Sequence, residues 1–185
     1  MRYFVAFRYL LLSLSLVVST GQAKTYISAV STDKVQQTLQ VNVKSHIELP
    51  EAVREAIHNG ITLVFSYQFE IKKQRWYPTK SLATIRKNYH LSYSRMTEKY
   101  QIENPITFER ETFNRLSSAV VAMQQLNDFP LILTSQLPKT PLTLAVRFRL
   151  TAENLPSYVR LERLFSDAWE ADSKWSNWPI QLSEP

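Results

Sequence analysis

The chain has 185 residues, and 22 Lys and Arg against 16 Asp and Glu give it a formal net charge of +6. It contains no cysteine, which excludes disulfides, thiolate catalysis and cysteine-ligated zinc or iron–sulfur sites. Its two glycines, Gly21 and Gly60, are too few and too far apart for a P-loop, a dinucleotide-binding fingerprint or a G-x-S-x-G nucleophile elbow.

The first 23 residues have the layout of a secretory signal peptide. Arg2 and Arg8 precede an apolar run, Tyr9–Val18, and small residues follow up to Ala23. The run is ten residues long, whereas a membrane-spanning helix needs roughly 20. We expect cleavage before Lys24, which leaves 162 residues with a net charge of +4 in the periplasm or outside the cell. If the segment stays uncleaved, it tethers the domain to the inner membrane.

The first part of the remaining chain predicts a hairpin and then a helix. Tyr26–Val30 is extended, and a polar turn is expected at Ser31–Lys34. Apolar and polar residues alternate along Leu39–Val43, which is typical of a half-buried strand. Pro50 suits the first helical position and Gly60 suits a left-handed C-terminal cap, so a helix is expected between them.

The next part predicts a meander of three strands. The clearest is Ile61–Ile71, in which every second residue is apolar and faces the core. Its other phase is expected to face solvent or a partner, and consists of Thr62, Val64, Ser66, Gln68 and Glu70. A polar turn at Lys72–Pro78 leads to strands within Leu82–Tyr93 and at Lys99–Glu103.

A main helix is predicted from Thr112 to Asn127, because apolar residues recur there at intervals of three and four. Phe129-Pro130 is expected to end it. A strand then begins at Leu131–Thr134, and the period-two pattern of Leu142–Leu150 predicts a second clean amphipathic strand.

The tail predicts a short helix over Leu161–Trp169, and Trp175 and Trp178 follow it. Side chains this large usually bury much of their area, so we expect the tail to wrap back over the sheets. The strands occur at hairpin spacing without a βαβ rhythm. We therefore predict a single, mainly β domain over residues 24–185, an antiparallel β-sandwich with two or three inserted helices. A curved sheet wrapped on a long helix is the alternative.

The best binding candidate is the basic and aromatic segment from Lys72 to Lys80. Its candidate site residues are Lys72, Lys73, Arg75, Trp76, Tyr77 and Lys80. Such a loop could bind anionic lipid head groups or a glycan through charge and stacking. The competing interpretation is a solvated turn in which Trp76 and Tyr77 fold inward.

Catalytic and metal-binding patterns are weak. His46, His58 and His90 lie in three different predicted elements, without the spacing of metal ligands. The candidate carboxylates for a glycosidase pair are Glu70, Glu98, Glu103, Glu109 and Glu111. A solvated strand face explains Glu70, and Glu109 and Glu111 precede the predicted helix, where acidic residues are favoured. Ser117 and Ser118 lie within the predicted helix and lack a base. We expect no metal, no cofactor and no enzymatic activity.

The order of several landmarks is similar to that of a known family. They are Leu49-x-x-Ala52, Ala56-Ile57-x-x-Gly60-Ile61, Phe69-Glu70, Arg75-Trp76-Tyr77, Tyr89-His90-Leu91-Ser92-Tyr93, Tyr100, Leu155-Pro156, Trp169, Ser173, Trp175 and Trp178. This order resembles exported proteobacterial proteins with domain of unknown function 4390. The resemblance implies an N-terminal signal or anchor, a periplasmic domain and no assigned activity. Family members are often encoded beside a membrane sensor kinase, which implies an accessory role in envelope sensing.

The function expected from these observations is a non-enzymatic periplasmic binding or regulatory module. It would present one polar sheet face, or the Lys72–Lys80 loop, to a membrane protein or an envelope polymer. Nucleotides are excluded by the missing glycine loops, and nucleic acid by export. A carrier of a lipid or other apolar ligand is the alternative, because the inward faces are rich in aromatic residues. A carboxylate-based glycan hydrolase is the third possibility.

Overall fold

A computed structural model of the protein describes residues 24–73, 81–151 and 167–180. The elements in chain order are β1 (Tyr26–Val35), β2 (Thr38–His46), α2 (Glu51–His58), β3 (Leu63–Lys73), β4 (Ala83–Ser94), β5 (Lys99–Glu103), β6 (Arg110–Phe113), α3 (Leu116–Met123), β7 (Gln125–Leu133), the 3₁₀ helix η1 (Thr134–Gln136), β8 (Leu142–Thr151), the 3₁₀ helix η2 (Asp167–Trp169) and β9 (Ser176–Pro179).

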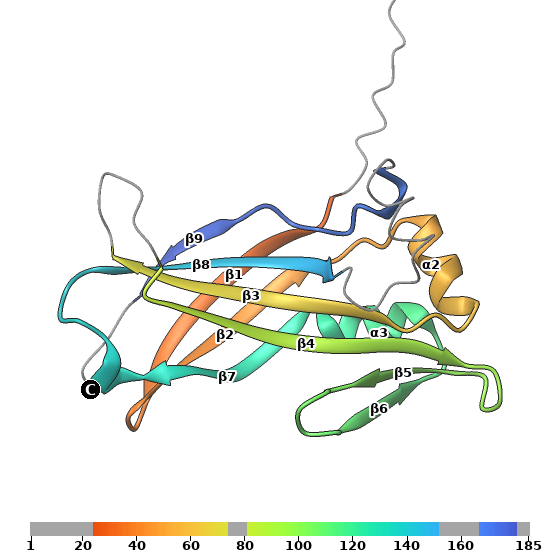
Figure 1. The fold of residues 1–185 in the computed structure, drawn as a ribbon, viewed down its shortest axis with the longest axis horizontal. Coiled ribbons are helices and arrows are strands. Elements are labelled where there is room, and N and C mark those ends of the chain that lie inside the picture. The colour runs from red at the N-terminus through yellow and green to blue at the C-terminus, as the bar shows by residue number, and fades with distance from the viewer. Residues whose placement is uncertain (1–23, 74–80, 152–166, 181–185) are drawn as a thin grey trace, which may run out of the picture.

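The strands form two antiparallel sheets, which confirms the predicted mainly β, sandwich-like fold. One sheet has the order β1-β2-β7, and the other has the order β6-β5-β4-β3-β8-β9. Figure 1 shows the six-stranded sheet in front of the three-stranded one, with α2 and α3 toward one end. The alternative of one sheet on a long helix is wrong, because α3 spans only eight residues.

The core lies between the two sheets. Phe65, Tyr67 and Phe69 point inward from β3 and Phe148 points inward from β8, and all four are fully buried. Their rings pack on one another, with centroids 5.7 Å apart for Phe65 and Phe148 and 5.0 Å apart for Tyr67 and Phe148. The opposing sheet contributes the apolar phase of β2, Leu39–Val43. The inward apolar phases predicted for these strands are therefore confirmed.

The helix α2 ends as its glycine predicts. Gly60 has a φ of +88°, the left-handed conformation that glycine adopts without strain. The Gly60 amide donates to the Ile57 carbonyl at 2.9 Å, and the Ile61 amide donates to the Ala56 carbonyl at 3.0 Å. These two bonds define a Schellman motif, which satisfies carbonyl groups at the helix end. Pro50 is the N-cap residue, one position earlier than expected.

The predicted helix from Thr112 to Asn127 is wrong at both ends. Thr112 and Phe113 belong to β6, and the chain becomes extended again at Gln125, where β7 begins. Leu126 is paired with Val43 of β2 in the strand register. The apolar residues of this segment recur every three or four residues, as in a helix. In the extended form, however, the backbone of β7 makes its hydrogen bonds with β2.

The edge strand β7 is irregular. It contains Pro130, which has no N–H, and Asp128 at a φ of +50°. The register against β2 shifts between Leu39 and Gln40 and again between Val41 and Val43. Pro130 was expected to end a helix, but it lies within this strand, as edge positions allow.

The first hairpin is longer than predicted. The expected turn at Ser31–Lys34 is wrong, because β1 continues to Val35 and pairs with β2 as far as Thr38. Gln36, with a φ of +55°, lies in the actual turn. Polar residues at Ser31–Lys34 reflect the exposed position of β1 at the sheet edge rather than a break in the strand.

The tail returns to the six-stranded sheet, as predicted from its tryptophans. The strand β9 pairs with β8, and the Ser173 amide donates to the Phe148 carbonyl at 2.7 Å. Trp169 is buried, while Trp175 remains 37% exposed. Of the predicted helix Leu161–Trp169, only Asp167–Trp169 falls within the described residues, where it forms η2.

Candidate functional site

The predicted binding segment is described only at its beginning. Lys72 and Lys73 are the last residues of β3. The other four candidates, Arg75, Trp76, Tyr77 and Lys80, lie outside the described residues. Lys72 nevertheless belongs to a basic and aromatic surface, which is made from other parts of the chain.

This surface is the outer face of the six-stranded sheet, the face turned away from the three-stranded sheet. Gln68 of β3 lies at its centre, opposite Arg86 of β4 on one side and Arg147 of β8 on the other. The Nε of Arg147 donates to Gln68 Oε1 at 2.9 Å. Because successive side chains of a strand alternate between faces, all three side chains project outward while Phe69 and Phe148 project into the core.

Trp175, from the tail, packs against Arg147 and Lys72 on this face. The guanidinium carbon of Arg147 lies 4.4 Å from the centroid of the Trp175 ring, and Lys72 Nζ lies 5.6 Å from it. Both are within the range of cation–π attraction. We call Lys72, Arg86, Arg147 and Trp175 the outer-face cluster.

Two carboxylates partly balance the charge around the outer-face cluster. Lys72 Nζ is paired with Glu70 at 2.7 Å, and Arg149 Nε lies 3.6 Å from Asp172. Within the described ranges, no carboxylate forms an ion pair with Arg86 or Arg147. Lys72, Arg86, Arg147 and Arg149 thus outnumber Glu70 and Asp172 by four charges to two.

The pKa of the Arg147 guanidinium is shifted by burial and by the neighbouring positive charges. Burial, followed by the charge of Arg149, lowers the pKa of the Arg147 guanidinium, and Arg86 acts in the same direction. Asp172 and Glu70 oppose the shift. A guanidinium stays protonated in proteins, so the result is a concentrated positive charge rather than a neutral side chain.

The outward-facing residues of β3 are more buried than the sequence predicted. The polar phase of β3 was expected to face solvent or a partner, but Ser66 is 1% exposed and Gln68 is 8% exposed. Gln68 is buried because the Arg147 side chain, which is itself covered by Trp175, is hydrogen-bonded to it. Trp175, at 37% exposed, remains accessible on this part of the face.

Sequence reasoning missed Arg86, Arg147 and Trp175. Arg147 and Arg149 occupy the polar phase of the predicted strand Leu142–Leu150, so the signal for an outward basic stripe was present. The neighbours of that stripe depended on the strand order, which places β3 between β4 and β8. Trp175 could be placed only once the tail was seen to pair along β8.

Tyr67 and Ser45 meet in the core, and the partly buried Lys87 lies next to Tyr67 in the strand register. The Tyr67 hydroxyl lies 2.5 Å from Ser45 Oγ, and Lys87 is registered opposite Tyr67 on the same face of the sheet. A tyrosine acting as a base needs a lowered pKa and access to substrate. Burial instead raises the pKa of Tyr67 to about 12, only partly offset by the Ser45 hydrogen bond, and the side chain is fully buried.

The three histidines lie in different elements, His46 in β2, His58 in α2 and His90 in β4. His58 packs against Tyr93, with ring centroids 4.8 Å apart, and its Nδ1 lies 3.2 Å from the Tyr100 hydroxyl. His46 stacks on Tyr26 at the start of β1, with ring centroids 5.3 Å apart. Within the described residues, no group of three His, Asp or Glu side chains is arranged to hold a metal ion.

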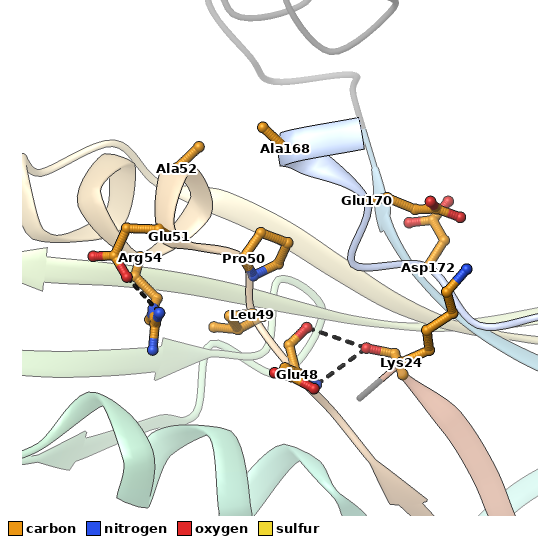
Figure 2. A pocket seen from close by; sticks show the side chains of 11 residues that line it. Lys24, Glu48, Leu49, Pro50, Glu51, Ala52, Arg54, Ala168, Glu170 and Asp172 are labelled. Atoms are coloured by element: carbon orange, nitrogen blue, oxygen red, sulfur yellow. Dashed lines mark hydrogen bonds and ion pairs between the residues drawn. The ribbon is translucent and has the colours of Figure 1, made fainter. Parts of the chain in front are cut away.

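A surface pocket of about 510 Å³ lies between the start of β1, the start of α2 and η2 (Figure 2). Its lining is mixed: charged side chains alternate with Leu49, Pro50, Ala52 and Ala168. Arg54 is paired with Glu51, and the Lys24 side chain extends toward Glu170 and Asp172. A second pocket of about 320 Å³ is lined by His58, Asn59, Tyr93, Arg95 and Glu98. Neither pocket is an enclosed apolar cavity.

Residues 22–179 match the family described as Domain of unknown function (DUF4390). The match covers most of the chain, so the protein belongs to this family, as its landmarks suggested. Comparisons with curated proteins and with solved structures give no match. Among the described residues, no helix has both the length and the apolar character required to cross a bilayer.

Proposed function

We propose that the protein is a non-enzymatic binding or regulatory module of the cell envelope. It acts in the periplasm after export and holds an anionic partner against the outer face of its six-stranded sheet. The observation that carries this proposal is the placement of Arg86 and Arg147 on either side of Gln68, with Trp175 stacked on Arg147.

The chemistry of the outer-face cluster supports binding rather than catalysis. Guanidinium and ammonium groups donate hydrogen bonds and attract anions, but a guanidinium does not give up its proton to act as a base. Ion pairs and stacking hold Lys72 and Arg147 in place before a partner arrives. A site ordered in advance loses less conformational entropy on binding.

The packed interior supports a surface site over the alternative of an apolar carrier. The inward aromatic rings of β3 and β8 contact one another, and the two pockets open to solvent beside charged side chains. A role as accessory to a membrane sensor fits the same face, because such a partner would bind from outside the sandwich.

Site-specific photocrosslinking in cells tests the proposal. A photoreactive residue is placed at Thr84 or Asn177, which are exposed on the outer face, or at Ser118, an exposed position on α3. We expect adducts from the first two positions and their loss when Arg86→Glu and Arg147→Glu are combined. Equal adducts from Ser118, or adducts unchanged by the charge reversals, would contradict it.

A further inference from the structure

The outer-face cluster has the geometry of a clamp for one anionic group. Neighbouring strands are about 4.8 Å apart, so Arg86 and Arg147 stand roughly 10 Å apart across Gln68. Their long side chains can converge above the Gln68 amide. The bond from Arg147 Nε to Gln68 fixes one guanidinium and leaves the donors of its terminal nitrogens for another acceptor.

Charge favours a phosphate in this position. In the described part of the chain, Lys72 and Arg149 are paired with carboxylates while Arg86 and Arg147 are not. An anion between these two guanidiniums would relieve their repulsion. The planar fork of arginine matches phosphate oxygens, and such charge-assisted hydrogen bonds are about twice as strong as neutral ones.

The surroundings of the clamp favour a membrane surface as the source of the phosphate. Trp175 is 37% exposed beside Lys72, and Leu82, whose amide donates to the Ile71 carbonyl, is 45% exposed at the same end of the sheet. Tryptophan is enriched at the level of lipid head groups. The net charge of +4 expected for residues 24–185 is complementary to an anionic leaflet.

We propose that Arg86 and Arg147 bind the phosphate of an anionic phospholipid head group, with Lys72, Trp175 and Leu82 lying at the bilayer interface. This inference rests on the proposed function, since it names the anionic partner of the same face. An acidic protein surface is the competing occupant, and the experiment below separates the two.

Vesicle co-sedimentation tests the inference with protein purified from the envelope fraction of expressing cells. Three vesicle types are compared: phosphatidylcholine alone, phosphatidylcholine with phosphatidylglycerol, and phosphatidylcholine with oleate at the same surface charge. We expect binding to the phosphatidylglycerol vesicles to exceed binding to the other two. Equal binding to the oleate vesicles would mean that the face recognises negative charge in general and not phosphate, and would contradict the inference.

A double variant, Arg86→Gln with Arg147→Gln, should weaken binding to phosphatidylglycerol vesicles by roughly 10- to 30-fold. The matched control is Arg54→Gln with Arg115→Gln, which removes the same charge from exposed positions outside the outer-face cluster. It should weaken binding much less, because it lowers the net charge equally but leaves the clamp intact, and circular dichroism melts verify that both variants fold. Equal weakening by the two pairs would contradict the inference.

Two further outcomes separate this inference from the proposed function. Calorimetric binding of inorganic phosphate without vesicle binding would replace the lipid by a soluble phosphate. Protein adducts from Thr84 in cells without vesicle binding would leave the proposed function standing with an acidic protein as partner. The absence of both vesicle binding and face-specific adducts would overturn both proposals.

Discussion

Tyr67 and Ser45 join the two sheets through their hydroxyl groups, which lie 2.5 Å apart in the core. The Tyr67 hydroxyl donates to the backbone carbonyl of Met123 at 2.9 Å, and Ser45 Oγ donates to the Gln124 carbonyl at 3.3 Å. One buried side chain of β3 is thereby tied to β2 and to the end of α3. Such a link restricts how the sheets can slide over each other.

Replacing Tyr67 by phenylalanine should lower the free energy of unfolding by about 1–3 kcal/mol, because the Met123 carbonyl loses its side-chain donor in a buried position. Urea denaturation measures the loss. Tyr93→Phe is the control: the Tyr93 ring packs against His58 and Tyr100 but is only partly buried, and its loss of a hydroxyl should change stability by about 0.5 kcal/mol or less. Equal losses in the two variants would contradict the assigned role of Tyr67.

Stability should fall in alkali because of the buried tyrosines. Burial raises the pKa of Tyr67 to about 12 from an ordinary value of 10.0. Below pH 10 the hydroxyl is protonated in both the folded and the unfolded chain, and its contribution is constant. Between pH 10 and pH 12 only the unfolded chain releases the proton, so the free energy of unfolding falls by roughly 1.4 kcal/mol per pH unit from this group.

Burial raises the pKa of Tyr89 as well, with smaller contributions from Tyr67 and Glu111, so Tyr89 adds to the same loss. Urea titrations at a series of alkaline pH values should therefore show a shallower decline in Tyr67→Phe than in the unchanged protein. Parallel declines in the two proteins would show that Tyr67 does not contribute.

Gly60→Ala should destabilise the protein by about 1 kcal/mol, because an L residue is strained at a φ of +88°. No atom lies within 4 Å of an added Cβ, so the cost comes from the backbone and not from a clash. Gly60→Asn should cost less, since asparagine tolerates this conformation better. Thermal melts that rank alanine and asparagine in the opposite order would refute this explanation.

Phe108 is expected to show the reverse behaviour. Its φ is +57° and its side chain is 76% exposed in the turn between β5 and β6. The Phe108 amide donates to the Asn104 carbonyl at 2.8 Å, which holds the turn in place. Phe108→Gly should therefore leave the melting temperature unchanged or raise it, because glycine removes strain and the phenyl ring buries little surface. A clear loss of stability would mean that the ring has a packing role.

Processing at the N-terminus can be measured directly. Protein recovered from the periplasmic fraction should begin at Lys24, as the small residues before it predict. N-terminal sequencing checks the cleavage site. Recovery of the uncleaved chain in the membrane fraction would favour the tethered alternative.

The sequence predicted those parts of the fold that have one clear period. The inward apolar phases of β3 and β8 and the glycine after α2 each have a single physical interpretation, and all three are confirmed, although the outward phase of β3 is largely buried as well. The segment after Met123 fits two periods, and its pairing with β2 is a long-range contact that local patterns do not encode. Prediction therefore failed where tertiary hydrogen bonds decided between helix and strand.

The sequence predicted a basic and aromatic site but not most of the residues that form it. Lys72 was identified within a basic and aromatic segment, and it does contact a tryptophan, but that residue is Trp175 from the tail. Arg86, Arg147 and Trp175 are separated in sequence and meet because β4, β3, β8 and the tail are neighbours. Strand order is set by the whole fold, so the outer-face cluster could not be predicted from any local sequence motif.

The irregular path of β7 has a consequence for how other molecules can attach. An incoming strand that tried to lengthen the smaller sheet at this border would meet Pro130, which has no amide proton to share, and a kinked backbone at Asp128. Growth of the sheet by strand addition is thus discouraged at this margin, as is self-association into fibrils. The opposite border of the smaller sheet is β1, a ten-residue strand without proline, so its two margins differ in their capacity to accept another strand.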